Sequence, residues 1–453
     1  MCSLALAACS SSGSSGVPHP VHTTPPPATA PPATPTPTPA GDPIKHVVII
    51  VQENRSFDNI FSGFPGADAP SYGYIGTRRV QLHATPLEQG YLSNNYINAI
   101  DSWDNGKMDD FDEAEPPSQH LPNLPYSYVT RSESAPYWSM AQQYVLADHM
   151  FPTEWGPSFT AHLNLIGGNT ELIPGKVAEV DAPDQLPWEC DAKTNTTTDT
   201  LNSAGQEDDN GPFPCFTQFR TLADTLDAAG VSWKYYSPSV FTGGLGGQAW
   251  SEFGAIKKVR YGPDWAKVVS PETTVLSDIP AGKLPGVSWV IPDLANSDHP
   301  GSGSNTGPSW VASVVNAVGT SSYWNSTAIV IVWDDWGGWY DDLVPPQLDF
   351  RGLGIRVPSI VVSPYARETS PKQTGYVSHT QYEFGSVLAF VEDTFHLPFL
   401  GTVDEGYTDA RANSLSDVVD FGQKPRAFRR IDAPKSQDYF LREIPSGRPP
   451  DDD

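Results

Sequence analysis

The sequence has little positive charge and lacks a long apolar run. Its 27 Lys and Arg residues are outnumbered by 53 Asp and Glu residues, giving a formal net charge of −26. This charge argues against a general nucleic-acid-binding protein, which needs a basic face. No run of roughly 18 consecutive apolar residues occurs, so no membrane-spanning helix is predicted. The 13 Trp, 18 Tyr and 19 Phe residues can bury a large core, which excludes disorder throughout.

The N-terminal region has the layout of an export signal followed by a stalk. Residues 6–9 (LAAC) resemble a bacterial lipobox, in which the cysteine is lipidated. We interpret residues 1–16 as a lipoprotein-type signal remnant with a Ser/Gly stretch, and Cys9 as its lipidation site. Residues 17–42 are rich in Pro and Thr and are expected to form an extended linker. This layout predicts an exported protein, secreted or held in the cell envelope, that meets a membrane only through a lipid anchor.

Cys190 and Cys215 form a second pair of cysteines, in a polar region of the chain. In an exported protein, two nearby cysteines are expected to form a disulfide. A zinc site is the weaker alternative, because no further cysteine or histidine lies at ligand spacing.

Residues 43–446 contain no second Pro-rich linker and no repeat, which predicts one large domain followed by an acidic tail at 447–453. Apolar, β-branched runs, typical of parallel strands buried on both faces, occur at residues 46–51, 287–291, 328–333 and 357–362. Helical patterns occur at residues 219–229, 310–318 and 381–394. The alternation of strands and helices predicts an α/β fold, a three-layer α/β/α sandwich with loop-rich insertions.

Polar residues follow two of these predicted strands. Glu53 and Asn54 come after the run at 46–51, and Asp334 and Asp335 come after the run at 328–333. Ligands of open α/β sheets bind beyond the carboxyl ends of the strands. Neighbouring buried carboxylates repel each other, and a divalent cation relieves that repulsion. The pattern favours a metal site over the alternative, in which both groups are helix caps or turns.

Ser158 is the candidate nucleophile. It lies in the segment GPSFTAH (residues 156–162) ahead of an apolar stretch, where it could begin a helix and face a phosphate. Beside a metal ion its hydroxyl could ionise and attack phosphorus. Alternatively, Ser158 is an ordinary helix N-cap.

Four segments together resemble the bacterial phosphoesterase family: HVVIIVQENRSFDNIFSGFPG, GPSFTAH, SWVIPDLANSDHP and IVIVWDDWGGWYDDLVPP. That family contains non-haemolytic-type phospholipases C and acid phosphatases and has an alkaline-phosphatase-like fold. The resemblance implies one divalent metal ion (Ca, Mg, Mn or Zn) with Ser158 as both ligand and nucleophile. It implies that the remaining ligands are Glu53, Asn54, Asp334 and Asp335. It also places His299 where a family histidine contacts the phosphoryl group.

Two positions depart from the family pattern. Asn94 lies near a place where family members often carry histidine, and Asp342 replaces the histidine that commonly follows GGWYD. We expect these changes to alter substrate range or rate without abolishing activity. His379, ahead of the last helical pattern, is a weaker candidate, because a histidine at a helix entry is more often structural.

The sequence thus predicts a metal-dependent hydrolase of phosphoric esters, acting on a phospholipid or a small phosphomonoester, with no nucleic-acid partner. The alternative from another class is a non-catalytic envelope binding protein. In that protein the acids would hold structural calcium, and Trp336, Trp339 and Tyr340 would bind a glycan or peptide from an exposed surface. A sulfatase-like enzyme is disfavoured, because no Cys or Ser stands in a Cys/Ser-x-Pro-x-Arg context.

Overall fold

The computed structural model of the protein describes residues 43–114, 123–180, 187–239, 250–369 and 375–448. The predicted signal remnant and linker (1–16 and 17–42), with Cys9, lie outside the described residues, as do residues 449–453 of the predicted tail. Within the described ranges, no helix has the length and apolar character needed to cross a bilayer.

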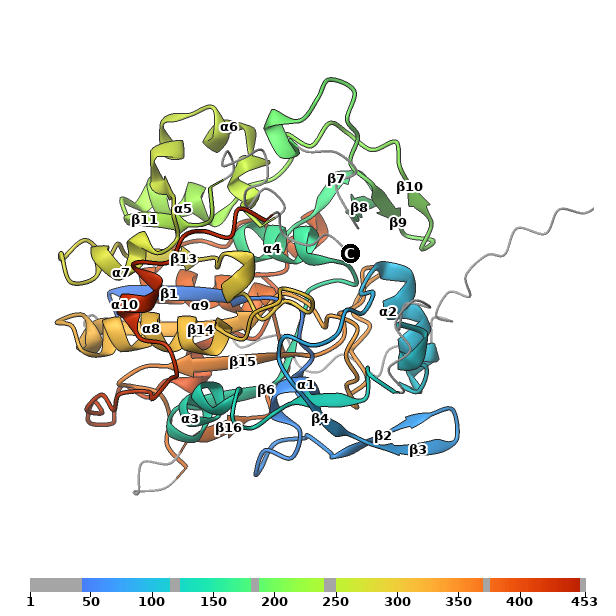
Figure 1. Ribbon diagram of the computed structural model, residues 1–453. Helices are drawn as coiled ribbons and strands as arrows, with labels where there is room; N and C mark the ends of the chain where they lie inside the picture. Colours follow the sequence, from blue (N-terminus) through green and yellow to red (C-terminus); the bar gives the residue numbers. More distant parts are fainter. Residues whose placement is uncertain (1–42, 115–122, 181–186, 240–249, 370–374, 449–453) are drawn as a thin grey trace, which may run out of the picture.

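The central element is a nine-stranded sheet with the order β12-β11-β13-β1-β14-β15-β6-β16, in which β17 also pairs with β6 (Figure 1). Its strands are β1 His46–Gln52, β6 Val145–Phe151, β11 Trp233–Tyr236, β12 Val268–Val269, β13 Val287–Val290, β14 Thr327–Trp333, β15 Val357–Val362, β16 Tyr376–Ser378 and β17 Tyr382–Glu383. β1 lies parallel to both β13 and β14, so that Ile50 pairs with Val290 and with Ile331. All three residues are fully buried, as expected for strands covered on both faces.

Two groups of helices form the outer layers of the sandwich. On one side α3 and α7 pack against α8, as does α10; on the other α4 packs against α9 and α5 (Figure 1). The helices are α1 Phe57–Phe61, α2 Tyr96–Trp103, α3 Ala135–Gln143, α4 Ser158–Gly167, α5 Leu222–Ala229, α6 Lys257–Arg260, α7 Thr274–Asp278, α8 Gly307–Gly319, α9 Phe384–Phe395 and α10 Gln437–Phe440. The predicted three-layer α/β/α fold is confirmed, with α5, α8 and α9 each beginning three residues from the predicted start.

The sheet differs from the prediction in one strand and contains another that was missed. β15 runs antiparallel to both β14 and β6, so the expectation of a parallel strand at 357–362 is wrong. An apolar run reports burial on both faces and carries no information about strand direction. The sequence pattern also missed β6, because Asp148 and His149 interrupt its apolar residues.

Small sheets make up the loop-rich insertions. A four-stranded sheet has the order β10-β9-β8-β7, and two-stranded sheets join β2 to β3 and β4 to β5. Their strands are β2 Tyr72–Ile75, β3 Arg78–Gln81, β4 His83–Thr85, β5 Ser127–Val129, β7 Glu171–Ile173, β8 Lys176–Ala178, β9 Thr200–Asn202 and β10 Glu207–Asp208. A disulfide joins Cys190 to Cys215, with Cα atoms 4.4 Å apart, and ties this insertion together.

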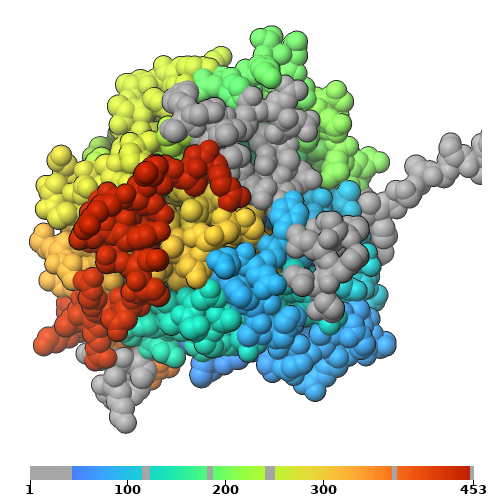
Figure 2. Space-filling model, viewed as in Figure 1, coloured from blue at the N-terminus to red at the C-terminus, as the bar shows by residue number. Residues whose placement is uncertain are grey.

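The C-terminal segment crosses the surface above the loop that follows β13. In Figure 2 it is the red band over the gold segment near residue 300. Ser446 donates its backbone N–H to Asp293 (3.0 Å), and Arg448 donates to the carbonyl of Ser302 (2.6 Å). The segment therefore holds the loop that carries His299.

Candidate active site

The register between β1 and β14 brings their polar ends together. Gln52 pairs with Trp333, so the following residues of the two strands lie side by side. The backbone N–H of Asn54 donates to Asp334 Oδ1 at 2.9 Å. Gly337 approaches this turn so closely that a Cβ atom there would lie 2.0 Å from the carbonyl oxygen of Asn54. The glycine after Asp335 and Trp336 is thus required for the two strand ends to meet.

Ser158 faces these strand ends from the start of α4. The helix N-cap is Pro157, and Ser158 is the first helical residue, so its hydroxyl does not serve as an N-cap. Ser158 Oγ lies 3.4 Å from Glu53 Oε2, 3.4 Å from Asn54 Oδ1 and 3.3 Å from Asp335 Oδ2. One hydroxyl proton can satisfy only one of these three acceptors.

His162 belongs to the same cluster and was missed at the sequence level. Its Nε2 lies 2.9 Å from Glu53 Oε1 and 3.8 Å from Asp334 Oδ2, and its Nδ1 lies 3.6 Å from Glu252 Oε2. A signal existed in the sequence. His162 follows Ser158 by four residues, so both side chains project from the same face of a helix. Glu252, in contrast, reaches the cluster from a distant segment and left no local signal.

Burial and like charge raise the pKa of Glu53 well above its ordinary value. Burial is the largest cause, followed by the charges of Asp334, Asp335 and Glu252. Burial also lowers the pKa of His162 to about 4, so this imidazole is neutral near pH 7 and does not balance the carboxylates.

The donor set fits a divalent cation. Oxygen atoms from Glu53, Asn54 and Asp335 surround one serine oxygen, and one ligand atom from each of Glu53, His162 and Asp334 lies within 4.8 Å of the others. In the part of the chain that the structure describes, Asp334 Oδ2 is buried and accepts no hydrogen bond. Carboxylates of this kind, with an imidazole beside them, suit Mg²⁺, Mn²⁺, Ca²⁺ or Zn²⁺.

His299 lies in the loop beside Glu53. The backbone N–H of Glu53 donates to the carbonyl of Ser297 at 2.8 Å. The Trp250 ring lies 6.0 Å from the His299 ring and 6.3 Å from the His162 ring, between centroids, so one indole contacts both histidines. His299 Nδ1 lies 2.6 Å from the Pro300 carbonyl, which only accepts. In the neutral ring the proton therefore sits on Nδ1, and Nε2 is the basic nitrogen.

Asp298 fixes this loop in an unusual backbone conformation, with a φ of 77°. Arg55 donates to the Asp298 carbonyl at 2.8 and 2.7 Å, and Tyr137 donates its hydroxyl to Asp298 Oδ2 at 2.6 Å. Burial raises the pKa of Asp298 to about 6. This network keeps His299 against Trp250.

Of the two positions that depart from the family pattern, only Asn94 reaches the site. Asn94 donates to Asp335 Oδ1 at 2.9 Å and so orients that carboxylate. Asp342 accepts from Arg356 at 2.9 Å in a separate cluster. His379 lies against Asp148, with Nδ1 2.9 Å from Oδ2, and also lies outside the Ser158 cluster.

The aromatic residues proposed for an exposed binding surface are buried. Trp336, Trp339 and Tyr340 are 2%, 0% and 3% exposed, so the expectation that they form an exposed surface is wrong. Tyr340, for example, packs against Phe111 and stacks on Tyr126.

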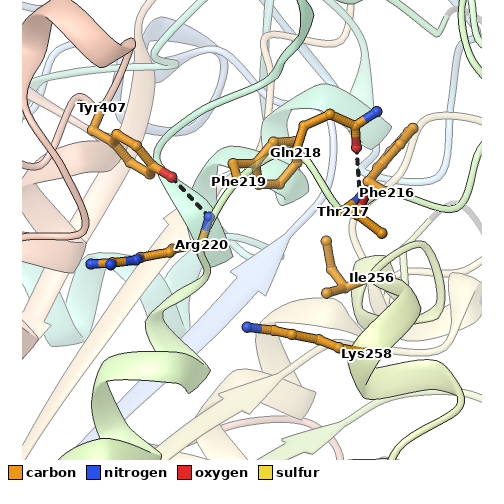
Figure 3. A pocket seen from close by; sticks show the side chains of 8 residues that line it. All are labelled: Phe216, Thr217, Gln218, Phe219, Arg220, Ile256, Lys258 and Tyr407. Carbon is orange, nitrogen blue, oxygen red and sulfur yellow. Dashed lines mark hydrogen bonds between the residues drawn. The ribbon is translucent and has the colours of Figure 1, made fainter.

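A separate pocket of about 380 Å³ contains none of the predicted site residues (Figure 3). Its walls bring Arg220 and Lys258 together with aromatic rings, and it is lined by Phe216, Thr217, Gln218, Phe219, Arg220, Ile256, Lys258 and Tyr407.

In this α/β/α sandwich, acidic strand ends gather around a serine at a helix start, an arrangement that suits a hydrolase. The model of the Phosphoesterase family matches residues 44–398, and the chain therefore belongs to the Phosphoesterase family. It is a phosphoric ester hydrolase, as the resemblance predicts.

Named relatives agree with this assignment. Phospholipase C B of Mycobacterium tuberculosis is 24% identical over 462 residues, covering 86% of this chain and 81% of the relative. The non-hemolytic phospholipase C of Pseudomonas aeruginosa is 23% identical, covering 78% of this chain and 54% of the relative. Among solved structures, a protein of the alkaline phosphatase superfamily from Vibrio parahaemolyticus is 12% identical, with a TM-score of 0.31 and coverage of 78% of this chain and 66% of that chain.

Proposed function

We propose that the chain is an exported, metal-dependent hydrolase of phosphoric esters in which Ser158 attacks phosphorus. The observation that carries this proposal is the position of Ser158 Oγ, 3.3–3.4 Å from oxygens of Glu53, Asn54 and Asp335. A hydroxyl alone cannot satisfy three acceptors, whereas a shared cation would contact all of these oxygens.

Glu53, Asn54, Asp334 and Asp335 would hold the cation. Bound there, it would lower the pKa of the Ser158 hydroxyl and neutralise charge on a phosphoryl oxygen. His162 lies against Glu53 and Asp334 and positions both carboxylates. Ser158 begins α4, and the unpaired backbone N–H groups of a first helical turn would favour a phosphate beside it.

The Ser158 hydroxyl releases its proton to solvent, and Oγ forms a bond to phosphorus while the bond from phosphorus to the leaving ester oxygen breaks. The leaving oxygen needs a proton, and we assign its delivery to Nε2 of a protonated His299 ring. Water then attacks the phosphoserine and gives one proton to Nε2 of the now neutral His299, while the bond from phosphorus to Ser158 Oγ breaks and Oγ regains a proton from solvent. Positioning and charge neutralisation dominate such transfers.

The substrate we favour is a phosphodiester with a lipid-type headgroup, because the named relatives are phospholipases C. The indole of Trp250 beside His162 and His299 supports this preference, since it provides an apolar wall next to the reacting groups. A small phosphomonoester is the second candidate. The Cys190–Cys215 disulfide supports export, because disulfides persist in oxidising compartments, and Cys9 is the proposed anchor.

The decisive experiment compares Ser158→Ala with Thr160→Val. Both changes remove a buried hydroxyl from the first turns of α4, but Thr160 donates to the carbonyl of Pro157 and not to the cluster. Turnover of a chromogenic phosphomonoester, a choline phosphodiester and a sulfate ester is measured for each variant. We expect Ser158→Ala to lose on the order of 10⁴-fold or more in kcat and Thr160→Val to retain nearly full activity.

A second readout concerns the covalent step. Acid quenching of wild-type enzyme during turnover of a substrate labelled at phosphorus should leave label on Ser158. Substantial phosphoesterase activity in Ser158→Ala would rule out the covalent mechanism, and preference for the sulfate ester would reassign the substrate class.

A further inference from the structure

A second group of metal-ligand side chains surrounds strand β6, which lies three strands from β1 in the sheet. At about 4.8 Å per strand, β6 itself lies on the order of 14 Å from β1. Asp148 and His149 lie in the middle of β6. Asp68 reaches them from the loop after α1, and His379 from the residue after β16. Two histidines and two aspartates, from three separate segments, thus meet at one point.

The geometry of this group is compact. His379 Nδ1 lies 3.0 and 2.9 Å from the two carboxylate oxygens of Asp148, and His149 Nε2 lies 2.9 Å from Asp68 Oδ2. One ligand atom from each of the four residues lies within 4.8 Å of the others. Ligands about 2.0–2.2 Å from a zinc ion lie roughly 3.5 Å from one another, so a small contraction would place all four on one ion.

The nearby guanidinium of Arg356 attracts the Asp68 carboxylate but donates its hydrogen bonds to other acceptors. Arg356 is buried beside this group, and its Nη1 donates to the backbone carbonyls of Asp68 and Asp148, at 2.8 and 2.9 Å. Its other nitrogens donate to Asp341 and Asp342. Two carboxylates therefore face two imidazoles, and one further donor, the backbone N–H of Asp68, reaches Asp148 Oδ2 at 2.9 Å.

We propose that Asp68, Asp148, His149 and His379 bind one divalent transition-metal ion of the zinc type, at a site separate from the active site. Two imidazoles and two carboxylates are a ligand set that Zn²⁺ accepts in tetrahedral geometry. The Asp148 side chain is fully buried and rigidly held, whereas those of Asp68 and His379 are 56% and 54% exposed. An ion can thus enter from solvent and find one preformed ligand.

The position of this site gives it a structural role. The ion would join the loop after α1, strand β6 and the turn after β16. α1 closely follows Glu53 and Asn54, and β6 leads through residues 152–157 to Ser158. The bound ion therefore stabilises the two segments that carry the nucleophile and two candidate ligands, without contacting substrate.

The test uses the full chain, stripped with chelator, and Zn²⁺ alone as the probe. An Asp335→Asn background weakens the proposed active-site ion, so that binding to the second site is measured by calorimetry and by the shift in Tm. We expect one Zn²⁺ to bind this variant and to raise its Tm. Adding His379→Gln should weaken that binding on the order of 100-fold and abolish the Tm shift. Adding His83→Gln, which changes an exposed histidine on β4, should alter neither.

His379 is half exposed, so its substitution is compatible with folding, and circular dichroism in chelator checks this. His149→Gln provides an independent variant with the same expected loss. His379→Gln in the wild-type chain should hydrolyse phosphoric esters at the wild-type kcat. The proposal is overturned if Asp335→Asn binds no Zn²⁺, or if the added His379→Gln or His149→Gln leaves its Zn²⁺ affinity unchanged. In that case the four side chains form only hydrogen bonds. Because Ser158 is intact throughout, this outcome is independent of the Ser158→Ala result.

Discussion

The segment DDWGGWYDD (residues 334–342) supplies acids to two buried clusters that differ in the basic side chain beside them. Its first pair, Asp334 and Asp335, joins Glu53 at the Ser158 cluster. Its second pair, Asp341 and Asp342, joins Asp58 around Arg356, whose Nε donates to Asp341 at 2.8 Å and whose Nη2 donates to Asp342 at 2.9 Å.

The Arg356 cluster carries its own counter-charge. Burial alone would lower the pKa of Arg356, but the carboxylates of Asp341, Asp58 and Asp342 raise it above its ordinary value. At the Ser158 cluster the neighbouring basic group is His162, whose pKa burial lowers to about 4. One cluster thus includes a positively charged side chain, whereas at the other we propose that a cation from solution supplies the positive charge. The comparison shows how acids from one short segment divide between a cluster paired with arginine and a cluster beside the candidate nucleophile Ser158.

The largest expected effect is that of Asp335→Asn. The substitution keeps the shape and the Oδ1 acceptor for Asn94 but removes a candidate ligand's charge. We expect kcat/KM for a phosphodiester to fall on the order of 10³-fold or more. In chelator the Tm should equal or exceed that of the wild type, because a like charge has been removed. A variant with wild-type turnover, or a wild-type enzyme indifferent to chelator, would refute the metal-dependent site.

Arg356→Met should lower the stability of the fold while leaving turnover nearly unchanged, the opposite of Asp335→Asn. Removing the guanidinium leaves the buried carboxylates of Asp58 and Asp341 without their partner, which costs about 3–5 kcal/mol of unfolding free energy. Urea unfolding measures this loss, and turnover per folded molecule should stay close to that of the wild type. Arg351→Met is a matched control, since Arg351 pairs with the partly exposed Asp349 and should cost much less. A loss no larger than that of the control would contradict the assigned structural role.

The pH dependence of stability offers a smaller test of the same contrast. Burial raises the pKa of Asp341 to about 7, although the charge of Arg356 opposes the shift. A carboxyl group whose pKa is raised in the folded state contributes stability that is complete below its ordinary pKa and is lost as the pH rises through the folded pKa. Unfolding free energy should therefore fall between about pH 4 and pH 7 by a few kcal/mol. Asp341→Asn should flatten this slope, and an unchanged slope would contradict the assignment.

The smallest effect is expected for Asp342→His, which introduces the residue that the family commonly has. Asp342 is directed at Arg356, and its side chain is 30% exposed. The variant should lose about 1 kcal/mol of unfolding free energy and change turnover little. A marked gain in kcat, measured on both phosphodiester and phosphomonoester, would show that this position reaches the substrate after all.

The local sequence determined the buried strands of this protein, the residues at their ends and the start of α4. Apolar, β-branched runs fixed β1, β13, β14 and β15 as buried strands, because burial on both faces leaves no place for polar residues. The same runs located the strand ends, and with them Glu53, Asn54, Asp334 and Asp335. Gly156 and Pro157 marked the start of α4 and therefore the position of Ser158.

Only the tertiary structure decided which side chains are the partners of each buried acid. The register of β1 and β14 places Asp334 beside the backbone of Asn54. Because β15 runs antiparallel to β14, Arg356 at its start lies beside Asp341 and Asp342 and not beside Ser158. Glu252 reached His162, and Asp68 reached His149, across long stretches of chain. Periodicity and composition report whether a residue is buried and in which element it lies. The partner that compensates a buried charge depends on how distant elements pack, and that information is absent from any local stretch of sequence.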